Sequence, residues 1–100
     1  MFWTADRRLF IELIERLVLR AVDPAAEVEM GAPLRPRLEF SLECVKAGEE
    51  LLGLDALCAS LCDYRLPLTA KDRDVIVDLA AQWGLDEFDL GCLEQLVTTA

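Results

Sequence analysis

Apolar residues recur three and four positions apart along most of this chain, and this spacing constrains the fold more than any other feature. Residues 69–84, TAKDRDVIVDLAAQWG, are the clearest instance. Thr69 is typical of an N-cap, Asp72 three positions later completes a capping box, and Gly84 is typical of a helix end. The apolar face of this predicted helix contains Val75, Ile76, Leu79, Ala80 and Trp83. No segment alternates apolar and polar residues between hairpin turns, so the sequence predicts an all-α fold.

The same spacing predicts further helices over residues 4–21, 38–48, 49–66 and 85–97. Residues 24–37, PAAEVEMGAPLRPR, hold three of the four prolines and are typical of a long connector. One hundred residues is the usual size of one domain. We therefore predict a single helical domain over residues 1–100, a compact bundle of four to five mostly antiparallel helices.

The charge of the chain is strongly acidic and unevenly distributed. The formal net charge is -9, and residues 51–100 hold nine acidic and three basic side chains against ten and seven in residues 1–50. Such a field repels nucleic-acid phosphates and anionic lipids, and it attracts a basic protein from a distance. We predict a basic protein partner and no direct binding of nucleic acid or membrane. The alternative is that the acidic residues only keep an apolar chain in solution.

The N-terminal segment is amphipathic. Residues 1–20, MFWTADRRLFIELIERLVLR, interrupt their apolar residues with Asp, Glu and Arg every few positions, unlike a signal peptide or a membrane span. Without such a signal, four cysteines suggest a reducing cytosol in which thiols behave as small core residues. The sequence thus predicts a cytoplasmic protein.

The cysteines do not have the spacing of a structural zinc site. Cys44, Cys58, Cys62 and Cys92 lack paired C-x2-C knuckles. Cys58 and Cys62 lie on a leucine-rich helical stripe, so we predict buried free thiols and no metal. The chain has no histidine, the commonest general base, and no Gly-rich phosphate loop. We therefore predict no enzymatic activity, no catalytic residues and no cofactor.

Residues 58–74, CASLCDYRLPLTAKDRD, end one helix and start the next within ten residues. A DNA-reading helix-turn-helix would need a basic second helix, but Lys71 and Arg73 are outnumbered there by Asp72, Asp74 and Asp78. This segment is therefore interpreted as a structural turn between two helices, in which Pro67 prevents the first helix from continuing.

The run AGEELLGLDALCASLCDYRLPLTAKDRDVIVDLAAQWGLD resembles the MafI-like immunity proteins of bacterial polymorphic toxin systems. The resemblance covers residues 47–86. Its matching features are Gly48-Glu49, Leu57-Cys58, Asp63-Tyr64, the Pro67-Leu68-Thr69 turn and Gly84-Leu85-Asp86. It implies a small helical cytoplasmic protein that binds and neutralises a cognate secreted toxin, and that has no catalytic residues.

An acidic chain suits such a role, because a toxin that acts on nucleic acid presents a basic cleft to phosphates. The predicted partner-binding residues are Asp63, Tyr64, Asp72, Asp74, Asp78, Asp86, Glu87 and Asp89. Tyr64 is the predicted aromatic anchor, whereas Trp83 and Phe88 have the spacing of core residues. The free protein is expected to be a monomer or weak dimer. The alternative function is that of a helical adaptor assembling through residues 4–21, where Ile11 and Leu19 lie off the main apolar stripe.

Overall fold

The computed structural model describes residues 3–98, and its first helix, α1 (Ala5–Leu17), begins as the sequence predicts. The hydroxyl of Thr4 accepts a hydrogen bond from the Arg7 backbone N–H at 3.4 Å, which caps the helix. The buried face of α1 comprises Phe10, Leu13, Ile14 and Leu17. Leu9, which the helical spacing also places beside Phe10 and Leu13, is 42% exposed. The helix also ends four residues earlier than predicted.

The prediction of a connector over residues 24–37 is wrong. This segment contains α2 (Pro24–Met30), and α3 begins at Arg35. The Asp23 carboxylate accepts a hydrogen bond from the Ala25 N–H at 2.9 Å, and Pro24 occupies the first turn, where a missing N–H costs nothing. Gly31 ends α2 with a left-handed φ of 73°. The residues that indicated a loop are therefore the start and stop signals of a short helix.

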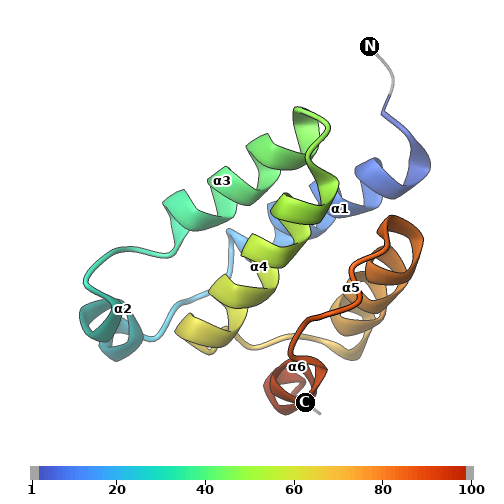
Figure 1. Ribbon diagram of the computed structural model, residues 1–100. Coiled ribbons are helices and arrows are strands. Elements are labelled where there is room, and N and C mark those ends of the chain that lie inside the picture. The colour runs from blue at the N-terminus through green and yellow to red at the C-terminus, as the bar shows by residue number, and fades with distance from the viewer. Residues whose placement is uncertain (1–2, 99–100) are drawn as a thin grey trace.

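Helices α3 (Arg35–Lys46) and α4 (Glu50–Tyr64) form an antiparallel hairpin, in which α4 is the central helix of the fold (Figure 1). Gly53 lets them pack closely, because a Cβ at this position would lie 2.6 Å from Val45 Cγ2 and 2.8 Å from the Ser41 carbonyl oxygen. The N-termini of α1 and α4 are joined by an ion pair between Arg7 and Glu50.

The helix predicted over residues 69–84 is confirmed as α5 (Ala70–Trp83). Thr69 and Asp72 form a reciprocal capping box, and Gly84 ends the helix with φ 78°. The last predicted helix is shorter than expected: α6 spans Leu90–Leu96 only. The chain then returns along the α4–α5 link, where Leu68 N–H donates to the Leu96 carbonyl and Thr98 N–H to the Leu68 carbonyl, both at 2.9 Å.

One apolar cluster joins the helices into a compact fold. Residues from α1 to α6 contribute to it, and Trp83 and Phe88 pack against it as expected. Residues 3–98 form six helices and no strand, so the all-α prediction is confirmed and the helix count is higher than predicted. None of these helices has the length and apolar character that crossing a bilayer requires.

Candidate protein-binding surface

The candidate surface lies around α6 and the loop that precedes it. The Asp89 carboxylate caps α6 by accepting a hydrogen bond from the Cys92 N–H at 2.9 Å. A disulfide bond between Cys62 and Cys92 ties α6 to α4, and an ion pair from Arg73 to Glu94 at 2.7 Å ties it to α5. A helix of seven residues is too short to be stable alone, so these links hold the surface in place.

The disulfide corrects the prediction that all four cysteines are free thiols. Cys44 and Cys58 are buried thiols as predicted, but Cys62 is only half-buried and bonded to Cys92. Thirty residues separate the two cysteines in the chain. They meet because the α5 segment returns the chain to α4, which cysteine spacing alone does not reveal.

Two hollows flank the start of α6. The first, of about 200 Å³, lies between α4 and the loop before α6. Its lining residues are Asp55, Cys58, Ala59, Cys62, Asp63, Phe88 and Asp89. It therefore brings together Asp63 and Asp89, which the sequence predicted as partner-binding residues. Asp55 was missed, although its spacing of eight residues from Asp63 places both on one side of a helix.

The second hollow, of about 550 Å³, lies between α5 and α6. It is lined by Arg73, Asp74, Val77, Asp78, Leu90 and Glu94. Asp74 and Asp78 were predicted as partner-binding residues, and Glu94 was not. Arg73 pairs with Asp74 at 3.0 Å as well as with Glu94, and so neutralises part of this wall. Asp89 lines the first hollow and the next residue, Leu90, lines the second.

Several carboxylates on this surface make no ion pair with another residue of the described chain. Asp86, Glu87 and Asp89 are exposed in and after the loop between α5 and α6. Within residues 3–98, no ion pair reaches Asp55, Asp78, Asp86, Glu87 or Asp89. Unpaired carboxylates around two partly apolar hollows are suited to binding a cationic protein surface, because their charge is available to a partner.

Tyr64 does not belong to this surface, contrary to the prediction. Its side chain is 1% exposed, and its hydroxyl donates a hydrogen bond to the Ala32 carbonyl at 2.8 Å. The Arg37 guanidinium covers the ring at 5.2 Å from its centroid. Tyr64 therefore fixes the segment between α2 and α3 against α4, a contact that the unrecognised helix α2 made impossible to predict.

Asp72 is also buried, at 1% exposure, and belongs to the core. Its carboxylate pairs with Arg20 at 2.6 Å and with Arg16 at 3.4 Å, which joins α5 to the end of α1. Burial alone would raise the pKa of this carboxyl, but hydrogen bonds from the Thr69 backbone and from Arg20 outweigh burial and lower the pKa below its usual value. Asp72 is thus a structural residue rather than a contact residue.

No group of three or more His, Cys, Asp or Glu residues in the described part of the chain is arranged to hold a metal ion. Comparison of the chain with protein-family models, with curated proteins and with solved structures found no match.

Proposed function

We propose that this chain is an immunity protein that binds a cognate basic toxin domain and neutralises it by covering the toxin's active cleft. The observation that carries the proposal is the group of unpaired carboxylates around the two hollows beside α6. A toxin that acts on nucleic acid needs a basic cleft for the phosphates, and an acidic surface is attracted to that cleft. Occupying the cleft blocks the substrate without any catalysis by the inhibitor.

The resemblance of residues 47–86 to MafI-like immunity proteins supports the same proposal. The matching segment contains α4, α5 and the first residues after α5, and it includes Asp63 and Asp86 of the acidic surface. In this proposal the protein protects the toxin-producing cell and its siblings, and the disulfide removes the free-thiol argument for a reducing cytosol. The free protein is a monomer or weak dimer, since a net charge of -9 opposes self-association.

Co-purification tests the proposal. The tagged chain is expressed together with the product of the gene next to its own, and the recovered complex is weighed by mass spectrometry. We expect one basic partner in a fixed ratio, with an association rate that falls steeply as salt is added. Recovery of the chain alone would refute the proposal.

A matched pair of charge reversals locates the surface. Asp86→Lys/Glu87→Lys changes two exposed carboxylates of the loop before α6, and Glu12→Lys/Glu15→Lys makes the same charge change on the exposed side of α1. We expect the first pair to slow association more than tenfold and the second to slow it much less, because close charges govern steering. Equal effects would mean that net charge, rather than this surface, attracts the partner.

A second candidate function is that of a helical adaptor, and one observation favours it. Leu9 is 42% exposed beside a hollow of about 270 Å³ on α1, and Leu19, just after α1, is 85% exposed. An adaptor would assemble through these leucines. Light scattering distinguishes the two functions. Leu9→Ser/Leu19→Ser would dissociate an adaptor assembly into single chains, and it would leave the molar mass of an immunity protein unchanged.

A further inference from the structure

We propose that the outer face of α4 is the binding site for a basic amphipathic helix of the partner. The inference deepens the proposed function, on which the identity of the partner rests. Leu52, Ala56, Ala59 and Asp63 recur at helical spacing along this face, and Leu52 is 50% exposed. The face extends over about 16 Å, or three helical turns.

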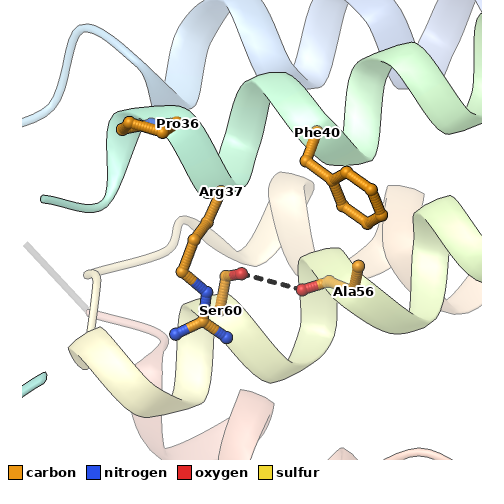
Figure 2. Close-up of a pocket in the computed structure, with 5 residues that line it drawn as sticks. All are labelled: Pro36, Arg37, Phe40, Ala56 and Ser60. Carbon is orange, nitrogen blue, oxygen red and sulfur yellow. Dashed lines mark hydrogen bonds between the residues drawn. The ribbon is translucent and has the colours of Figure 1, made fainter. Parts of the chain in front are cut away.

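An aromatic side chain stands on each side of this face. A third hollow, of about 320 Å³, lies between α3 and α4 and is lined by Pro36, Arg37, Phe40, Ala56 and Ser60. Figure 2 shows the Phe40 ring reaching from α3 toward Ala56, and Phe40 is 53% exposed. On the other side of α4, Phe88 lines the hollow that also contains Ala59. A helix lying on the two alanines would therefore contact both rings.

The floor between the rings is suited to apolar side chains. The Ser60 hydroxyl donates to the Ala56 carbonyl at 2.8 Å, so it needs no partner of its own (Figure 2). The alanine side chains are small and let another backbone approach closely. Arg37, which lines the hollow with Phe40, pairs at 2.9 Å with Asp63, which lines the hollow with Phe88, so an ion pair links the walls of the two hollows.

Charge selects the occupant. Asp55 and Asp89 line the hollow with Phe88 and make no ion pair within residues 3–98. Lysine or arginine at the edge of the partner's apolar face would form ion pairs with these two carboxylates. A second copy of this chain would bring a charge of -9 against -9. The complementary occupant is therefore a basic chain rather than a copy of the protein.

A helix fits the site better than an extended strand. Strand addition needs an unpaired sheet edge, and the only β pairing in residues 3–98 is the single bridge between Leu68 and Val97. A straight face of helical length between two aromatic walls is instead the geometry of helix-in-groove recognition.

A synthetic peptide tests this inference without the toxin. The probe is a fluorescein-labelled helical peptide of about 18 residues with leucine and alanine on one face and lysine on the other, titrated against the intact, oxidised chain. Two control peptides carry either central prolines or glutamate in place of lysine. We expect the prolines to weaken binding at least tenfold and the glutamates to abolish it. Equal binding of the proline peptide would overturn the inference, because charge alone would then explain binding.

Variants locate the peptide. Ala59→Gln and Phe40→Ser are each expected to weaken binding at least fivefold, and Ala81→Gln, on an exposed alanine of α5, is the matched control. Circular dichroism checks that each variant is folded, and amide chemical shifts should change along α4. Unchanged affinity of folded Ala59→Gln, with shifts elsewhere, would overturn the inference. If the peptide binds here but no toxin co-purifies, only the proposed function fails; if a toxin complex forms and ignores Ala59→Gln, only the docking site fails.

Discussion

Breaking the disulfide bond between Cys62 and Cys92 should lower the free energy of unfolding by an amount that depends on the number of residues in the loop it closes. The bond closes a loop of 30 residues, and the chain-entropy relation for such a loop gives about 4 kcal/mol at 25 °C. This is a large part of the stability of a domain of this size. The loss of stability should be concentrated in α6, because without the disulfide this helix is held mainly by Leu93, its one fully buried side chain.

Urea denaturation with and without a reducing agent measures this effect. The oxidised protein should unfold at a much higher midpoint than the reduced one, and hydrogen exchange should show that the α6 amides lose protection first. Cys62→Ser/Cys92→Ser is the control, because its midpoint should match the reduced protein and ignore the reductant. Midpoints that agree for the oxidised and reduced protein, with the disulfide verified by mass, would refute the assignment of the bond as the main anchor of α6.

Three other predictions concern two glycines, the buried Asp72 and the buried thiol of Cys58. Gly53→Ala should destabilise the protein by about 1–2 kcal/mol, because a Cβ there would meet the Ser41 carbonyl. Gly91→Ala should stabilise it by up to about 1 kcal/mol, because a Cβ at this helical position has no atom nearer than 3.5 Å. Thermal unfolding of both variants checks the contrast. Asp72→Asn should cost about 3 kcal/mol. The pKa of Asp72 is lowered in the fold, so its ionised carboxylate stabilises the folded state fully above the unfolded-state pKa of about 3.9. This stabilisation is lost as pH falls through the lower folded-state pKa. In urea melts at decreasing pH, Asp72→Asn should therefore lose less stability than the wild-type chain. Burial raises the pKa of the Cys58 thiol to about 12, so iodoacetamide at pH 8 should leave it unlabelled until the protein is unfolded, as peptide mass mapping would show.

Local signals in the sequence were enough to predict α5. Thr69, Asp72 and Gly84 each act on the backbone within a few residues, so their effect does not depend on the rest of the fold. The same kind of signal surrounds α2, where Asp23, Pro24 and Gly31 begin and end a helix. It was misread because α2 spans only seven residues and buries only one of them, Ala26, which leaves no apolar periodicity to detect.

The acidic surface was predictable in part for a related reason. Asp86, Glu87 and Asp89 lie in a loop or at a helix start, and such carboxylates are exposed in almost any fold. The exposure of Tyr64 and Asp72 depends on which segments pack opposite them. Tyr64 is covered by Ala32 and Arg37, and Asp72 is covered by Arg16 and Arg20. The disulfide joins residues 30 positions apart, and Phe40 and Phe88 reach α4 from other segments of the chain, so only the tertiary structure reveals these contacts.

Growth rescue tests the central claim most directly. Cells that induce the product of the gene adjacent to this one are followed with and without the chain, and with its two charge-reversed variants. The account predicts that the wild-type chain and Glu12→Lys/Glu15→Lys restore growth, and that Asp86→Lys/Glu87→Lys does not, although it is folded and equally abundant. Full rescue by the Asp86→Lys/Glu87→Lys variant, or no rescue by the wild-type chain, would contradict neutralisation through the acidic surface around α6.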